Sequence, residues 1–249
     1  MLRNFFLVSE FEFRAIINDK PGLLRIFMEP FAYLFLLAAG LQSIVGIYQV
    51  DYISFVYPGI VGLQLLRLFL HSIYRLTIDR RWGLQAIKMI AGTTNLAYFL
   101  GMSVVPICLF IVQTSISYPL ALLLGVQLSI SGFFALLIVG ILATFFWVSL
   151  AIVCTYYFKK YSQRDLFIQF LFLPISLSAP IFYSLDNVPE YLKVISHFNP
   201  LSYQVIALRE LFLNLTISTN FYITLSLSIF SMWIALKFMK NAEYLPSEI

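Results

Sequence analysis

Five consecutive residues in a strongly apolar chain combine charge with a large aromatic ring. They are Asp79, Arg80, Arg81, Trp82 and Gly83. Tryptophan and arginine are enriched among the side chains that anchor protein–protein contacts, so this group could seat a partner protein. Asp79 would then cap a helix or meet a basic group. The alternative is an ordinary basic loop of a membrane protein, with a tryptophan at the membrane–water interface.

Arg67 and His71 are ionisable residues inside a long apolar stretch, four residues apart and therefore on one face of a helix. Ionisable side chains within a membrane are costly and usually functional. This pair could line a polar pathway for an anionic head group. Alternatively, Arg67 pairs with an acid or with carbonyls on a neighbouring helix, or extends toward the interface. Glu29 follows Arg25 by one turn, which favours an ion pair at the interface.

Residues suited to catalysis or metal binding are sparse. The two histidines, His71 and His197, cannot form an HExxH zinc site. Cys108 and Cys154 lie far apart within apolar stretches and are expected to be packing residues.

No glycine precedes a lysine, so there is no Walker A loop, and GxGxxG is also absent. We expect no catalytic residue, no metal site and no cofactor on this chain, so that ATP and Mg²⁺ would be used by a partner. The alternative of a membrane-embedded enzyme lacks a catalytic constellation.

The elements that must position these residues are membrane helices. Of 249 residues, 61% are hydrophobic and 11% charged, and the mean hydropathy is +0.89, whereas soluble domains are about 45–50% apolar and about 25% charged. We predict an all-α polytopic membrane protein with one transmembrane domain over residues 1–249. Six apolar stretches are long enough to cross a bilayer. They cover about 26–48, 53–75, 96–118, 131–157, 167–185 and 220–237.

The orientation follows from the basic residues. Most of the 16 Lys and Arg residues fall before the first span, in alternate loops and after the sixth span. Such a bias marks the cytoplasmic side, so both termini are predicted to be inside. The expected location is a cell membrane, the cytoplasmic (inner) membrane if the source is a bacterium. The net charge of +4 is explained by this bias, and we expect the lipid bilayer, not nucleic acid, as the partner of the basic residues.

Two further segments are predicted to be helical without crossing. Residues 3–18 place apolar and polar side chains on opposite faces, typical of an amphipathic helix in the membrane interface. Residues 183–212 predict two short helices separated at Asn199-Pro200, which would re-enter the outer leaflet or cover the mouth of a pathway. A surface loop packed on the bundle is the alternative. Aromatic side chains such as Phe182, Tyr183 and Tyr203 could contact sugars, lipids or drugs there, or simply pack.

Several of these motifs carry a family resemblance. They are FVYPGI at 55–60, IDRRWGLQAIKMI at 78–90 and PIFYSLDNVPEYLKVISHFNPLSYQVIALREL at 180–211. The most specific parts are the D-R-x-x-G element at 79–83 and the long outer element. The chain resembles the ABC-2 type transporter permeases. It is similar to the daunorubicin-resistance and nodulation-factor export permeases, and more distantly to capsule and O-antigen export permeases.

The resemblance implies a six-span permease that forms a homodimer and binds two copies of a separate ATPase. It places a coupling helix at 78–90, with Asp79 to Gly83 as the ATPase-coupling residues. It also implies export of an amphipathic drug, lipid or lipid-linked glycan along the dimer interface. The candidate pathway or gate residues are Arg67, His71, Phe182, Tyr183, Pro200 and Tyr203.

The stretch AGTTN at 91–95 stands where many drug-type relatives have a proline, which weakens assignment to that branch. An ion-coupled secondary carrier is the alternative of another class. It is disfavoured because no repeat relates the two halves and few acids lie near the bilayer centre.

Overall fold

The computed structural model describes residues 2–38, 40, 52–127, 129–158 and 160–241, and in these ranges every regular element is a helix. The all-α prediction is confirmed. The elements in chain order are α1 (Leu2–Asn18), α2 (Lys20–Ala32), the π-helix η1 (Tyr33–Ala38), α4 (Tyr52–Arg81), α5 (Leu84–Ile90), α6 (Asn95–Leu123), α7 (Ile130–Thr155), α8 (Tyr161–Ser178), the 3-10 helix η2 (Leu185–Asn187), α9 (Glu190–Phe198), α10 (Pro200–Asn214) and α11 (Thr219–Asn241).

Four of the six predicted spans are helices long and apolar enough to cross a membrane, by length and composition. They are α4, α6, α7 and α11. The predicted first span begins in α2 and η1, but much of its second half lies outside the described residues. The predicted fifth span is shorter than expected, because α8 ends at Ser178. Pro180 lacks an N–H and disfavours helical geometry in the residue before it, and Ala179 is extended, with ψ 143°.

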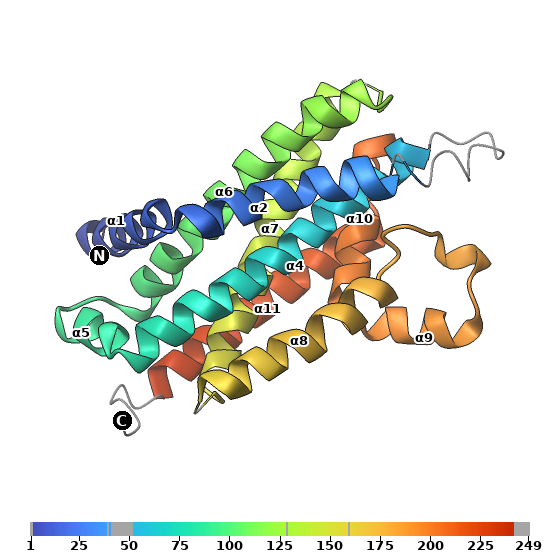
Figure 1. Cartoon of the computed structure of the whole chain (residues 1–249). Helices are drawn as coiled ribbons and strands as arrows, with labels where there is room; N and C mark the ends of the chain where they lie inside the picture. Colours follow the sequence, from blue (N-terminus) through green and yellow to red (C-terminus); the bar gives the residue numbers. More distant parts are fainter. Residues whose placement is uncertain (1, 39, 41–51, 128, 159, 242–249) are drawn as a thin grey trace.

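Helix α4 is the centre of the bundle. It contacts α7, α10, α6, α8 and η1, and most of its side chains are buried. Gly62 allows α10 to approach closely, since a Cβ at this position would lie 2.5 Å from Cγ2 of Val205. In Figure 1, α4 runs diagonally through the molecule, and it packs beside α2 and α10.

The outer segment contributes one buried helix and one exposed helix. In α10, the predicted apolar stripe packs into the core, because its four side chains are almost fully buried. These are Leu201, Val205, Leu208 and Phe212. The alternative of a surface loop is therefore wrong for α10, which packs between α4, α7 and α11. Helix α9 instead exposes apolar side chains, including Tyr191 and Phe198.

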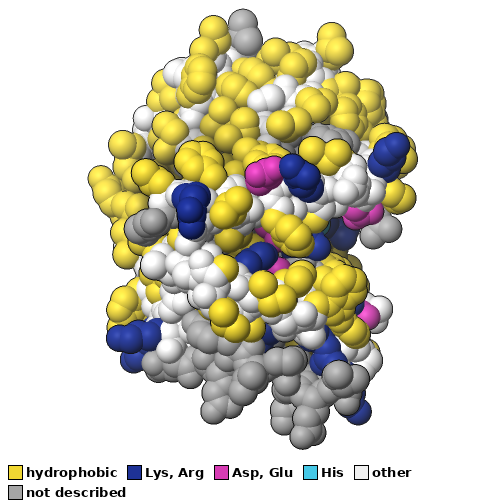
Figure 2. All heavy atoms as spheres, turned by 90° about the vertical axis from the view of Figure 1, so that its left-hand side faces the viewer, with side chains coloured by type: hydrophobic (Ala, Val, Ile, Leu, Met, Phe, Trp, Pro, Cys, Tyr) yellow, Lys and Arg dark blue, Asp and Glu magenta, His cyan; other side chains and the backbone are white. Residues whose placement is uncertain are grey.

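The two ends of the bundle differ. The N-terminal helix α1, helix α5 and the last turn of α11 lie at one end, which we call the α5 end, and α9 lies at the opposite end (Figure 1). Figure 2 shows the α5 end, where Lys and Arg side chains are scattered among apolar ones and outnumber the acidic side chains in view.

Candidate functional site

The segment predicted as one helix at 78–90 is two helices joined by a tight turn. Helix α4 continues to Arg81, and α5 begins at Leu84. Gly83 has a φ of +71°, a left-handed conformation that glycine adopts without the steric cost of a Cβ. Trp82 is 70% exposed on this turn. The chain reverses here, so that α5 returns alongside the end of α4.

Asp79 is not available to a partner protein, because it is fully buried. Its Oδ1 lies 2.6 Å from Nζ of Lys88 on α5, and its Oδ2 accepts a hydrogen bond of 2.7 Å from the hydroxyl of Tyr98 on α6. Asp79 therefore meets a basic group, one of the two predicted alternatives, and does not cap a helix. Its contacts hold α4, α5 and α6 together.

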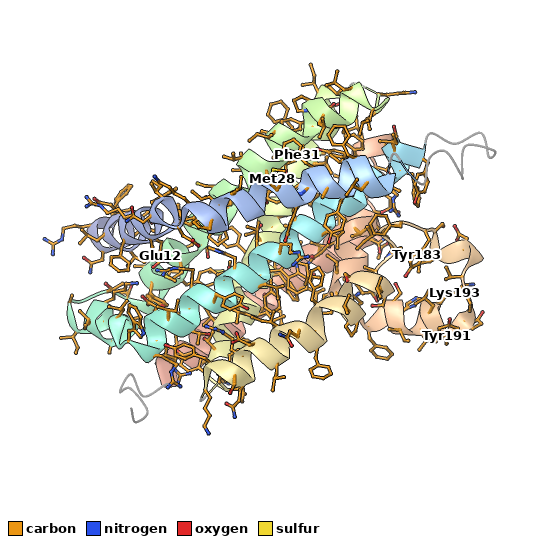
Figure 3. All side chains as sticks on the ribbon, viewed as in Figure 1. Glu12, Met28, Phe31, Tyr183, Tyr191 and Lys193 are labelled. Carbon is orange, nitrogen blue, oxygen red and sulfur yellow. The ribbon has the colours of Figure 1, made fainter. Side chains whose placement is uncertain are left out.

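A second buried acid extends this group to α1. Glu12 accepts hydrogen bonds of 3.0 and 3.1 Å from Arg75, and Nζ of Lys88 lies 3.5 Å from its Oε1. In Figure 3, Glu12 lies where α1 meets the bundle, far from Tyr183 at the opposite end. We call Glu12, Arg75, Asp79, Lys88 and Tyr98 the ion cluster. Two acids and two bases balance its charge, which makes burial of these groups tolerable.

Helix α1 buries one side against the bundle and exposes the other. Its buried residues are Val8, Ser9, Glu12 and Ile16, and they include the acid of the ion cluster. Phe6 and Ile17 are exposed. The helix is also tied to the turn after α5, since Nδ2 of Asn4 donates to the carbonyl of Gly92 at 2.7 Å. The bundle-facing side of α1 therefore combines the apolar Val8 and Ile16 with the Glu12 carboxylate.

The two arginines of the 79–83 group face the neighbouring helices. Arg80 donates to the carbonyl of Thr155 at 2.9 Å and lies over the ring of Tyr156, with 4.0 Å to the centroid. Arg81 lies over the ring of Tyr161, 4.9 Å from its centroid. Among the five predicted coupling residues, Trp82 is therefore the one whose side chain is mainly solvent-exposed. The others position the turn.

A groove of about 370 Å³ lies between α1 and α5. Its apolar lining includes Leu7 and Phe11 of α1 and Leu84 and Ile87 of α5. Ile87 and the neighbouring Ile90 are exposed. Together with Trp82, these side chains form an apolar surface at the α5 end that could receive another protein.

Arg67 and His71 lie in different surroundings, although they are four residues apart. Arg67 forms an ion pair of 3.0 Å with Glu29 of α2, and its guanidinium lies 3.9 Å from the centroid of the Phe172 ring. His71 lines a small cavity with Glu12 and Arg75. Glu29 therefore pairs with Arg67 of α4, and its predicted pair with Arg25 stays a prediction, because the Arg25 side chain lies outside the described residues. Of the alternatives for Arg67, pairing with an acid on a neighbouring helix is the one observed.

The predicted gate residues at the α9 end form backbone contacts. The Tyr183 hydroxyl donates to the carbonyl of Leu177 at 2.7 Å, and the Tyr203 hydroxyl donates to that of His197 at 2.8 Å. The carbonyl of Phe182 accepts from the Tyr52 hydroxyl at 3.1 Å. These bonds fix the path of the chain between α8 and α10.

Asn199 and Pro200 form the junction between α9 and α10. Pro200 occupies the first turn of α10, and the side chain of Asn199 caps that helix by accepting from the N–H of Leu201 at 2.9 Å. The Asn199 amide also donates to the carbonyl of Ile175 and the hydroxyl of Ser178, at 2.7 and 2.9 Å. The junction therefore secures both outer helices to the end of α8.

Arg209 is an important outer residue that sequence reasoning missed. It donates to the carbonyls of Phe55, Pro180 and Ile181 at 3.0, 2.7 and 3.2 Å. Burial lowers the pKa of Arg209 to about 10, so the side chain is charged at neutral pH. Its only sequence signal was position, as one of few basic residues in the predicted outer loops.

Among the described residues, no group of three His, Cys, Asp or Glu side chains could hold a metal ion. The site at the α5 end is an arrangement of helices held together by side-chain contacts. An exposed turn and a short helix are joined through buried ion pairs to the membrane helices.

Comparison with known proteins identifies the family. Residues 3–213 match the family described as ABC-2 type transporter. The match covers most of the chain and includes the ion cluster, the exposed turn and α10. No curated protein matches the chain. The family consists of membrane subunits of transporters, in agreement with the apolar helices. The chain therefore belongs to the ABC-2 type transporter family.

Proposed function

We propose that this chain is the permease subunit of an ATP-binding cassette exporter, driven by ATP hydrolysis on a separate ATPase. The observation that carries this proposal is the placement of α5. It is exposed at the end of the bundle, and Lys88 joins it to the buried acids Glu12 and Asp79. A partner that displaces α5 would therefore move α1, α4 and α6 with it.

The ATPase would bind at the α4–α5 turn. Trp82 offers a large exposed ring, and Ile87 and Ile90 extend the apolar surface along α5. When two ATPase subunits close on ATP, they would change the position of this surface and so bias a permease with two conformations. Because the buried ion pairs resist separation, the displacement would reach the membrane helices.

The substrate pathway would run along the face that carries Arg67 and Glu29. Their side chains are 33% and 27% exposed, and Arg67 lies near the middle of the 30-residue helix α4. Ionisable side chains at such depth almost always face protein or a water-filled cavity rather than lipid. We therefore place a second copy of the chain against this face, with α2–η1 and α8 completing six spans. An amphipathic drug, lipid or lipid-linked glycan would pass between the copies.

The outer helices would form the exit gate. Asn199 and Arg209 connect α10 to the end of α8 through side chain to carbonyl hydrogen bonds. These contacts must rearrange if the chain between α8 and α10 moves aside during export. In the orientation expected from the basic residues, the α5 end faces the cytoplasm of a bacterium and the α9 end faces outward.

Reconstitution tests the proposal. The tagged chain is co-expressed with a candidate Walker A ATPase from the same genome, and the purified complex is placed in liposomes with a panel of fluorescent amphiphiles. We expect the ATPase to co-purify and transport to require ATP, with an ATPase variant lacking its catalytic glutamate as the control. Transport by the permease alone, driven by a proton or sodium gradient, would refute the proposal and favour a secondary carrier.

A further inference from the structure

A small cavity with mainly apolar walls lies beside the Arg67–Glu29 ion pair. Its lining combines the apolar side chains Pro30, Ile60 and Leu63 with polar ones from α2, η1, α4 and α6. These polar side chains are Glu29, Tyr33, Gln64, Arg67 and Gln113. The cavity itself has room for a group about the size of one water molecule. It is separate from the ion cluster at the α5 end.

Gln64 brings an unused hydrogen-bond donor to this cavity. The side chain is 3% exposed, and its Oε1 accepts from the hydroxyl of Thr114 at 3.3 Å. Among the described residues, its Nε2 has no hydrogen-bond partner. A buried amide donor without an acceptor is costly, and native proteins rarely leave one unused. The described part of the chain therefore offers this donor no acceptor, and a bound molecule could supply one.

The charge of the surroundings restricts what that acceptor can be. Among the described residues that line the cavity, Arg67 is the cation, and Glu29 neutralises it at 3.0 Å. The Tyr33 hydroxyl adds a further polar group, 3.4 Å from Arg67. An anionic head group, which Arg67 alone would favour, would meet the Glu29 carboxylate. A cationic group would meet the guanidinium and the Gln64 donor. An uncharged group with both acceptor and donor capacity, such as a hydroxyl, suits this lining.

Access to the cavity comes from the face with the ion pair. Arg67 and Glu29 are each about one-third exposed, whereas Gln64 lies behind them in the bundle. Phe172 of α8 covers the guanidinium with its ring. A substrate on this face could insert one polar group toward Gln64 while its remaining part stays against the apolar side chains.

We propose that Gln64, with the Arg67–Glu29 pair and Tyr33, binds an uncharged, hydroxyl-bearing group of the transported molecule, and thereby selects against charged head groups. This inference rests on the proposed function, since it assigns the substrate class of that pathway. Gln64 is a specificity residue in it, and Glu29 sets the charge preference.

The test uses the full-length permease in lipid nanodiscs without an ATPase. Three fluorescent NBD-labelled single-chain lipids of equal tail length carry a glucosyl, a phosphate or a trimethylammonium head group. Binding is measured by fluorescence titration against empty nanodiscs. We expect the glucosyl probe to bind at least about tenfold more tightly than either charged probe. Gln64→Leu should weaken the glucosyl probe about fivefold to tenfold, the loss expected for one hydrogen bond.

Glu29→Gln provides an independent variant, because it removes the neutralising charge from Arg67. The phosphate probe should then bind at least about tenfold more tightly than it does to the unmodified chain. Gln169→Leu, the same change at an exposed position of α8, is the matched control and should leave all three affinities unchanged. A loss of packing alone would weaken all probes together and could not invert the charge preference.

Equal affinity for the three head groups, or Gln64→Leu binding like the control, would overturn the inference and leave a buried water as the acceptor. Failure of the proposed function is distinguishable, because it appears as absent ATP-driven transport with head-group selectivity intact. If the permease binds all three head groups equally but still transports with ATP, this inference is refuted and the proposed function stands.

Discussion

Nζ of Lys88 lies 2.6 Å from Oδ1 of Asp79, and this contact fastens the exposed helix α5 to the buried end of α4. Asp79 also accepts a hydrogen bond from Tyr98, while Lys88 reaches Glu12 of α1. The ion pair between Asp79 and Lys88 therefore connects four helices, namely α4 and α5 directly, α6 through Tyr98 and α1 through Glu12. A short helix of seven residues would be marginal by itself, so its position depends on this contact.

Removing Lys88 should destabilise the protein strongly. Lys88→Met leaves the fully buried Asp79 carboxylate without its cation, and breaking a buried ion pair from one side costs about 3–5 kcal/mol. Thermal unfolding of the purified permease in detergent measures the effect. Lys193→Met is the control, since Lys193 pairs with Glu190 at 3.9 Å on an exposed helix, where such pairs contribute at most about 1 kcal/mol.

The double variant Lys88→Met/Asp79→Asn should recover part of the lost stability, because the unpaired charge is removed together with its partner. A melting temperature of Lys88→Met equal to that of the Lys193→Met control would contradict the role given to the ion cluster.

Arg209→Met should loosen the α9 end of the bundle. The change leaves the carbonyls of Phe55, Pro180 and Ile181 without the donor that they share, and each buried unsatisfied group costs about 1–3 kcal/mol. We expect a lower melting temperature and a lower transport rate, with partial rescue by Arg209→Lys. Arg14→Met, on the exposed face of α1, is the control. Unchanged stability and transport would show that these carbonyls need no donor.

Pro200→Ala should slow transport severalfold while leaving assembly with the ATPase intact. Proline fixes φ at the start of α10 and keeps Asn199 extended, the conformation from which Asn199 reaches the end of α8. Transport assays on equal amounts of purified complex measure the change. Pro189→Ala, before the exposed helix α9, serves as control. If the Pro200→Ala variant transports at the rate of this control, the junction between α9 and α10 has no part in transport, and its role in the exit gate is contradicted.

The orientation can be tested by cysteine labelling in a chain whose Cys108 and Cys154 are replaced by alanine. Cysteines at Arg81 and Lys160 should be protected from an impermeant thiol reagent added outside cells, and a cysteine at Glu190 should react. The reason is the concentration of basic residues at the α5 end. Permeabilised cells, in which all three should react, are the control. Outside labelling of the first two positions would overturn the six-span topology.

Properties set by composition and periodicity could be predicted from the sequence. The long apolar stretches became α4, α6, α7 and α11, and the helix break at Asn199-Pro200 was found where proline chemistry places it. The apolar stripe from Leu201 to Phe212 also identified the buried face of α10. These features depend on neighbouring residues along the chain, which a single sequence displays directly.

Contacts between distant segments could not be predicted. Glu12 and Arg75 are 63 positions apart, and nothing in the pattern of α1 marked Glu12 as the acid that turns inward. Local spacing directed attention to the basic residue one turn before Glu29 and gave no signal for the ion pair with Arg67, 38 positions further along the chain. The turn at Gly83 was missed because the stretch 78–90 has continuous helical character, and the positive φ that breaks it follows from tertiary contacts of α5.

The association of the ATPase with Trp82 tests the account most directly, because this permease has no nucleotide site of its own in its sequence. Trp82 is 70% exposed on the turn before α5. Truncating an aromatic anchor of an interface costs about 2–4 kcal/mol, which corresponds to about 30- to 1,000-fold in affinity. Trp233→Ala, at an exposed tryptophan of α11, is the matched control for loss of a large ring.

Affinity is measured by titrating the purified ATPase onto the immobilised permease. The account predicts that Trp82→Ala weakens binding of the ATPase at least about 30-fold and abolishes ATP-driven transport, while the variant still inserts and keeps its melting temperature. Trp233→Ala should bind the ATPase as the unmodified chain does. If Trp82→Ala binds the ATPase with unchanged affinity and transports normally, the α4–α5 turn is not the coupling element and the account is contradicted.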